Sequence, residues 1–246
     1  MPKSVHLSDS PAIGLLSGIG PLAGSDILMR MVAYAAHTYG AHNDEDYPDI
    51  FFLNHGIKGV DNTAKLDTTF RDGIVEGVYR LEEWGASLIG IACNTAHSYL
   101  NDLQVRDTTV MVDLIEEVAL RAQRNHVLYG LLTSRGTLDS RLYIDKLLAY
   151  DVEFLAANES QQDDLDSAIS YVMAHRSDEA ARILKKVLID FKHKGVTHFI
   201  IGCTELPLAI DQMDKDDILV ISSNQVLAEK LVDLYYRYKH NSIVLK

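Results

Sequence analysis

The chain alternates short apolar runs, rich in β-branched residues, with longer amphipathic stretches. The runs predicted as strands are Ala12–Ser17, Ile50–Asn54, Ser87–Ala92, Thr109–Val112, Val127–Thr133, Val152–Ala156, His198–Gly202 and Ile218–Ile221. Helical spacing between them predicts helices over Pro21–His37, Thr63–Trp84, Leu138–Ala149, Asp164–His175, Asp178–Lys194 and Gln225–Tyr238, with Asn224 capping the last. This alternation is typical of βαβ units, in which successive strands lie parallel. We therefore predict an α/β fold built on mainly parallel sheets.

Two pairs of similar segments indicate an internal repeat. GLLSGIG at 14–20 resembles GLLTSRG at 130–136, and GIACNT at 90–95 resembles IIGCTE at 200–205, with offsets of 116 and 110 residues. The agreement in order and spacing predicts two pseudosymmetric domains, each a mainly parallel sheet flanked by helices. We expect residues 1–113 plus 222–246 to form the first domain and residues 114–221 the second.

The two cysteines of the chain, Cys93 and Cys203, each follow an apolar run of this repeat. Ligands of open parallel α/β sheets collect at the carboxyl ends of the strands, so both thiols are candidates for one site. Other roles are an inert packing role or a disulfide. A zinc site is disfavoured because neither Cys-x-x-Cys nor paired histidines occur.

A helix is expected to begin directly after each cysteine. Asn94 or Thr95 is predicted to cap the first helix and Thr204 the second. The free N–H groups of a helix start bind carboxylates and are expected to lower the thiol pKa. Two such thiols facing one substrate carbon suit a racemase or epimerase, in which one removes a proton and the other returns one to the opposite face.

The first strand is followed by the glycine-rich segment GLLSGIGPLAGSD. Its glycine spacing is not that of the dinucleotide-binding fingerprint, and it lacks the lysine of a P-loop. We interpret it as a turn whose backbone N–H groups bind a small anion. A tight turn needed only for packing is the alternative.

Together, GLLSGIGPLAGSD, GIACNTAH, GLLTSRGTLDSRLY and IIGCTELPLAI resemble the aspartate/glutamate racemase family, and within it the aspartate racemases. The resemblance covers nearly the whole chain. It implies two α/β domains with the active site in the cleft between them, catalysis without pyridoxal phosphate or another cofactor, and a homodimer. It also implies that Cys93 and Cys203 are the paired acid and base. The substrate-binding residues carried over are Ser17, Gly18, Asn54, Asn94, Thr95, Ser134, Thr137 and Thr204.

The chain departs from the family pattern where an arginine usually grips the side-chain carboxylate of the substrate. Asn62 stands there, and a neutral amide cannot form the same charge-assisted pair. A family lysine expected near residues 169–176 is also absent. The candidates for compensation are Lys58, Arg71, His175 and Arg176.

Four further residues lie near these motifs. His97 is expected to serve capping or packing, and Glu205 to orient a neighbour or interact with the helix dipole rather than act as a base. His55 is a candidate for lining the cleft, and Tyr143 for closing it.

The formal net charge of −12 argues against nucleic-acid and anionic-membrane partners. No apolar stretch approaches the ~20 residues of a membrane span, and the N-terminus lacks the apolar core of a signal peptide. We expect a cytoplasmic enzyme with reduced thiols that racemises an acidic amino acid, aspartate or glutamate. The alternatives are a decarboxylase or cis–trans isomerase of small diacids from the same superfamily, and a catalytically silent carboxylate-binding protein.

Overall fold

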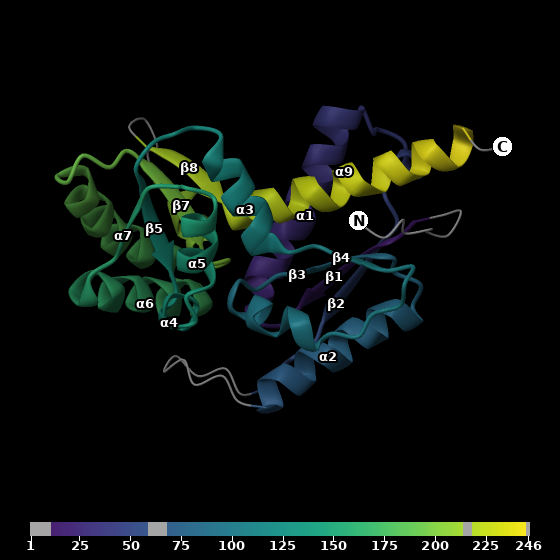
Figure 1. Ribbon diagram of the computed structural model, residues 1–246, viewed down its shortest axis with the longest axis horizontal. Coiled ribbons are helices and arrows are strands. Elements are labelled where there is room, and N and C mark those ends of the chain that lie inside the picture. Colours follow the sequence, from purple (N-terminus) through teal and green to yellow (C-terminus); the bar gives the residue numbers. More distant parts are fainter. Residues whose placement is uncertain (1–10, 59–67, 214–217, 245–246) are drawn as a thin grey trace.

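The computed structural model describes residues 11–58, 68–213 and 218–244, and these residues form two four-stranded parallel sheets (Figure 1). The first sheet has the order β2-β1-β3-β4, with β1 Ile13–Ser17, β2 Ile50–Asn54, β3 Leu88–Ile91 and β4 Val110–Met111. The second has the order β6-β5-β7-β8, with β5 Tyr129–Thr133, β6 Phe154–Ala156, β7 His198–Gly202 and β8 Leu219–Ser222. The α/β fold is confirmed.

The two sheets repeat one another strand for strand. The GLL segments of the predicted repeat lie on β1 and β5, which pair with β3 and β7 respectively. Every residue of β1 and of β5 is buried, as expected for inner strands of parallel sheets that are covered on both faces. The predicted pseudosymmetric architecture is therefore confirmed, and β3 and β7 occupy equivalent positions in it.

The helices connect these strands and lie against the sheets (Figure 1). They are α1 Pro21–Tyr39, α2 Thr68–Glu83, α3 Leu114–Gln123, α4 Arg135–Asp139, α5 Leu142–Ala149, α6 Glu159–Met173, α7 Ser177–Lys192, α8 Leu206–Ile210 and α9 Ser223–Val244, with 3₁₀ segments η1 Asp44–Asp46 and η2 Thr95–Asp102. Pro21 begins α1, as predicted, because proline suits the first helical turn.

Local capping explains where the predicted helices were wrong. The single helix expected over Leu138–Ala149 is two helices, because Arg141 adopts a left-handed φ of 59° between them. Helix α6 begins five residues earlier than predicted, since Asn158 and Gln161 form a capping box. Asn224 is not the cap of α9, because that helix already begins at Ser223.

Helix α3 was missed, although its start carries a sequence signal. The Asp113 side chain accepts a hydrogen bond from the backbone N–H of Glu116 and caps the helix.

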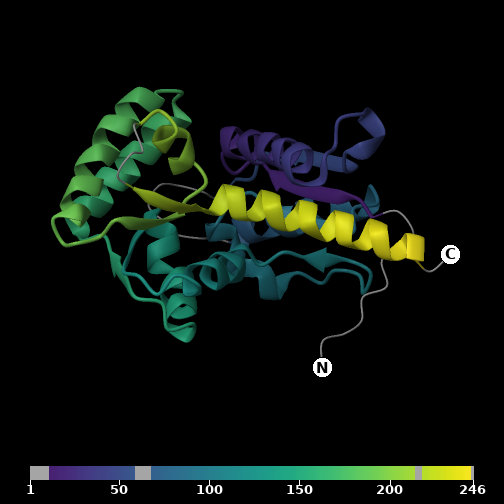
Figure 2. The ribbon, with the colours of Figure 1, turned by 90° about the horizontal axis from the view of Figure 1, so that it is seen from above.

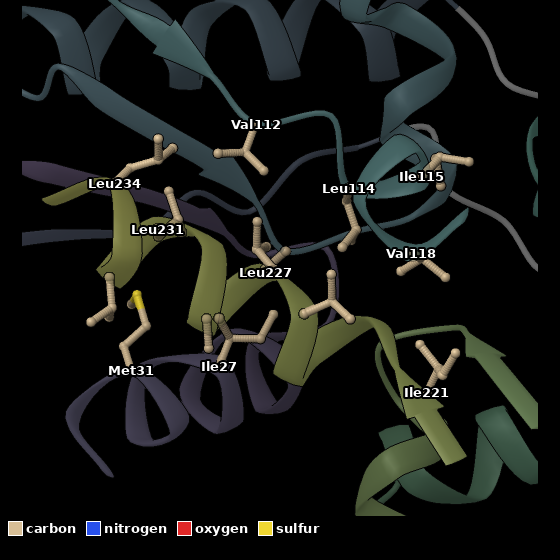
Figure 3. Packing of buried hydrophobic residues seen from close by; sticks show 14 of the residues in the cluster. Ile27, Met31, Val112, Leu114, Ile115, Val118, Ile221, Leu227, Leu231 and Leu234 are labelled. Carbon is tan, nitrogen blue, oxygen red and sulfur yellow. The ribbon is translucent and has the colours of Figure 1, made fainter. Parts of the chain in front are cut away.

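Among the described residues, the buried hydrophobic side chains form three clusters. One belongs to the first sheet and α2, and another to the second sheet with α6, α7 and α8. The third joins the two halves through residues of both sheets and of α1, α3 and α9 (Figure 3). Two labelled members of the third cluster are Leu227 of α9 and Ile27 of α1, both fully buried. The two halves thus share a packed interior.

Helix α9 carries the chain back from the second half to the first. It follows β8 and then packs against α1, which it crosses in the view of Figure 1 and which lies beside it in Figure 2. This return agrees with a first domain that includes the C-terminal helix, and the domain limits themselves stay a prediction. Among the described helices, none combines the length and apolarity needed to cross a bilayer.

Candidate active site

Cys93 and Cys203 lie just beyond the carboxyl ends of the equivalent strands β3 and β7. Both are buried free thiols, so the disulfide alternative is wrong for this structure. The two cysteines come from different sheets, and a charge on Cys93 is one of the factors that raise the pKa of Cys203.

A cluster of hydroxyl groups joins the two halves beside Cys93. The Thr95 Oγ1 lies 2.8 Å from Thr137 Oγ1 and 3.4 Å from Ser134 Oγ. Ser134 also caps α4 by accepting from the backbone N–H of Thr137 at 3.3 Å. The structure thus brings together three of the predicted substrate-binding residues, one from the first half and two from the second.

Asn94 is held by its side chain and does not act as a helix cap. Its Oδ1 accepts a 2.7 Å hydrogen bond from the Tyr143 hydroxyl, and its Nδ2 donates to Ser223 Oγ at 3.1 Å. No side-chain bond caps η2. The capping prediction is wrong here because other elements engage the amide, and Tyr143 takes part in the site through it.

Glu205 links the loop after β7 to the first glycine-rich turn. Its Oε2 accepts hydrogen bonds from Cys203 Sγ and Thr204 Oγ1, both at 3.2 Å. Any side chain at Gly20 would overlap its Oε1, so the turn and this carboxyl are in close contact. Thr204 does not cap α8, whose N-cap position is Glu205 with no side-chain bond. Its hydroxyl is committed to the Glu205 carboxyl instead.

Ser17, Gly18 and Asn54 lie at the ends of the neighbouring strands β1 and β2, where Ser17 and Asn54 are register partners. The Ser17 Oγ is buried, has no hydrogen-bond partner among the residues that the structure describes, and lies against Gly24 of α1. Gly18 has a φ of 101° and lies directly against the His55 carbonyl. Asn54 is exposed at the end of an edge strand. Their roles in binding substrate stay predictions.

Burial raises the pKa of both thiols. For Cys93 the pKa rises to about 12, first from burial and then from the charge of Glu205, while backbone N–H groups of Ala96 and Thr95 lower it. The pKa of Cys203 rises well above its usual value for the same two leading reasons. The predicted lowering is therefore wrong: the N–H groups are present, but the cost of burying a thiolate exceeds their effect.

Replacing Glu205 with Gln is expected to lower the pKa of both thiols, because it removes the negative charge that raises each of them. The change is measured as the pH dependence of iodoacetamide labelling at each cysteine, read by mass spectrometry. Glu179→Gln on α7, whose carboxylate pairs with Arg176, is the control and leaves both profiles unchanged. Profiles of Glu205→Gln that match the unaltered protein would contradict the role of this charge.

Two of the residues considered as replacements for the family arginine pair with nearby carboxylates. Arg71 pairs with Asp72 at 2.7 Å, and Arg176 pairs with Glu179 at 3.0 Å and stacks on Tyr171. Lys58 and His175 are exposed, and Asn62 lies outside the described residues.

His97 is buried next to the backbone of Cys93, and its expected capping or packing role stays a prediction. Its Nδ1 lies 2.8 Å from the Cys93 carbonyl oxygen, and burial lowers its pKa.

The model of the family described as Asp/Glu/Hydantoin racemase matches residues 16–231 of this chain. The chain belongs to this racemase family. The "Broad specificity amino-acid racemase RacX" of Bacillus subtilis (strain 168) is 24% identical over 227 residues, which are 92% of this chain and 99% of that relative. A glutamate racemase of Shewanella woodyi is 29% identical over 161 residues, which are 61% of this chain and 58% of that protein.

Solved structures of the family share the fold. The aspartate racemase of Picrophilus torridus superposes with a TM-score of 0.79 at 23% identity, covering 94% of this chain and 99% of that one. A glutamate racemase of Bacillus anthracis, isoform RacE1, gives a TM-score of 0.68 at 16% identity, covering 94% of this chain and 83% of that one. The two-domain α/β fold expected from the resemblance is thus confirmed.

Proposed function

We propose that the protein racemises an acidic amino acid, aspartate or glutamate, with Cys93 and Cys203 as the two acid–base groups and without a cofactor. The observation that carries the proposal is the pair of buried free thiols at equivalent strand ends of two repeated sheets. Membership of the racemase family and the aspartate and glutamate racemases among its relatives support the same reaction.

In the proposed mechanism one cysteine, as a thiolate, removes the proton from the α-carbon of the substrate. The other, as a thiol, delivers its proton to the opposite face, so the configuration inverts and the two cysteines exchange protonation states. The backbone N–H groups of Thr95 and Ala96 stabilise the Cys93 thiolate. The hydroxyls of Thr95, Ser134 and Thr137 exchange their mutual hydrogen bonds for bonds to the substrate carboxylate, which stabilises the carbanion-like transition state.

The raised pKa values of the two thiols affect how the reactive thiolate forms. Without bound substrate, burial disfavours the thiolate form of both cysteines. Formation of the reactive thiolate then depends on the bound substrate, whose ammonium group offsets the negative charge of Glu205 and of the thiolate.

A chiral assay of the L-amino acids in heavy water tests the proposal, with Asp and Glu examined first. We expect deuterium at the α-carbon and equal amounts of both enantiomers at equilibrium. Racemisation of neutral amino acids only would contradict the acidic substrate class, and the breadth named for the Bacillus subtilis relative makes that panel informative. Release of carbon dioxide, isomerisation of an unsaturated diacid, or binding without exchange would identify one of the other functions.

The assembly and location belong to the same proposal. The homodimer and the cytoplasmic location implied by the sequence stay predictions. Light scattering of the purified protein measures the first, and fractionation of the native cell the second.

A further inference from the structure

We propose that Ser223 and Asn224, the first two residues of α9, are positioning residues that hold the two cysteine loops at a fixed separation. This inference rests on the proposed function, since a two-base reaction needs its two thiols placed on opposite sides of one carbon. Neither residue was assigned to the site from its sequence context.

The two residues bind one cysteine loop each. Ser223 Oγ accepts a 3.1 Å hydrogen bond from Nδ2 of Asn94, the residue after Cys93. Asn224 Nδ2 donates a 2.9 Å hydrogen bond to the carbonyl oxygen of Thr204, the residue after Cys203. Both Ser223 and Asn224 are fully buried, at 0% exposure. One dipeptide thus contacts the equivalent position of both halves of the repeat.

Each contact is fixed by a further element. The Asn94 Oδ1 accepts from the Tyr143 hydroxyl of α5 at 2.7 Å, which leaves its amide little freedom to turn. Asn224 Nδ2 also donates to Asp26 Oδ2 of α1 at 2.7 Å. Asp26 is itself bound by Arg30, which reaches Asp211 at 2.7 Å beyond α8. Hydrogen bonds therefore connect the dipeptide to both cysteine loops, directly to α1, and through Asn94 to α5.

The covalent structure explains why this arrangement sets a distance. Consecutive Cα atoms are ~3.8 Å apart across a trans peptide, so Ser223 and Asn224 cannot separate. They also begin a long helix that packs on both β3 and β7, the strands that lead to the two cysteines. Movement of one sheet relative to the other is thereby opposed at the place where the thiols must stay in register.

The test compares Ser223→Ala and Asn224→Ala with Ser222→Ala. Ser222 is the matched control because its Oγ is buried but has no hydrogen-bond partner within the described part of the chain. We expect each test variant to lower kcat by about 10- to 100-fold, with a much smaller change in KM, since small displacements of reacting groups have effects of this order. Ser222→Ala stays within about twofold of the unaltered protein, because it breaks no hydrogen bond.

A second measurement reports the thiol separation without depending on catalysis. Dibromobimane loses two bromides and bridges two thiols within its reach, and intact mass distinguishes the bridged product from separate labelling of each cysteine. The bridged fraction of labelled protein is expected to be high in the unaltered protein and in Ser222→Ala. The bridged fraction is expected to fall in Ser223→Ala and Asn224→Ala. Ser223→Ala is the smaller change, so it still tests the inference if Asn224→Ala does not fold.

Two outcomes would overturn the inference. One is a bridged fraction and a kcat in both test variants that equal those of Ser222→Ala. The other is unaltered protein whose labelled cysteines are not bridged. If the unaltered protein bridges its thiols but racemises no amino acid, the proposed function fails while the positioning role stands on the cross-linking result.

Discussion

Replacing Cys93 with Ala is expected to reduce racemisation by at least about 10³-fold, because the reaction loses one of its two proton-transfer groups. Cys203→Ala is expected to do the same. Both cysteines are buried, so thermal unfolding of each variant shows whether the fold survives the loss of a small side chain. Rates of inversion from each enantiomer, followed by chiral separation, measure the effect.

Deuterium exchange separates a two-base mechanism from a single-base one. The cysteine that remains can still remove a proton from one face and return a deuteron to that same face. Cys93→Ala should therefore retain slow exchange with one enantiomer only, and Cys203→Ala with the other. Full activity in either variant, or residual exchange with the same enantiomer in both, would rule out the two-thiol scheme.

Gly18→Ala is expected to destabilise the protein by about 3 kcal/mol, the sum of backbone strain and steric overlap. Gly18 has a φ of 101°, and a Cβ there would overlap the backbone carbonyl of His55. A flexible side chain could move aside, but this carbonyl is fixed by the β1–β2 pairing, in which the His55 N–H bonds to the Ser17 carbonyl at 3.0 Å. The loss would lower the melting temperature by about 6–12 °C for a chain of this size.

Gly40→Ala is the matched control. Gly40 also has a left-handed φ, 72°, at the C-terminus of α1, but a Cβ there would meet no atom of the described residues within 4 Å. Gly40→Ala is therefore expected to lower the free energy of unfolding by about 1 kcal/mol, from the strained backbone conformation alone. Calorimetric unfolding of both variants measures the difference. Equal losses would show that the contact between Gly18 and His55 contributes nothing beyond backbone conformation.

The positions of the strands were predictable from the sequence because burial on both faces gives an uninterrupted apolar run. Strands β2 and β7 have the predicted limits, Ile50–Asn54 and His198–Gly202, and the other strands differ by one or two residues at their ends. Helix limits were less predictable, since caps such as Asn158 and a single left-handed residue such as Arg141 decide them. Those features depend on a few atoms and leave the apolar periodicity unchanged.

Some features of the candidate site were likewise predictable from the sequence, and others were not. The repeat placed both cysteines at equivalent strand ends, and Thr95, Ser134 and Thr137 do come together. The pKa direction of the thiols was not predictable, because the sequence shows the nearby helix starts but not how deeply the sulfur atoms are buried. Ser223 and Asn224 were likewise missed, since their partners lie 129 and 20 residues away in the chain.

The amino-acid sequence alone determined the alternation of strands and helices, the repetition of one sheet by another and the place of a cysteine at the same strand end in each. These follow from local periodicity and spacing, which the chain carries wherever it folds. Only the tertiary structure decided that Glu205 contacts Cys203, that burial raises both thiol pKa values, and that one turn of α9 holds both cysteine loops. Such contacts join segments that are distant in the chain, and their energies depend on burial, which exists only once the two sheets have packed together.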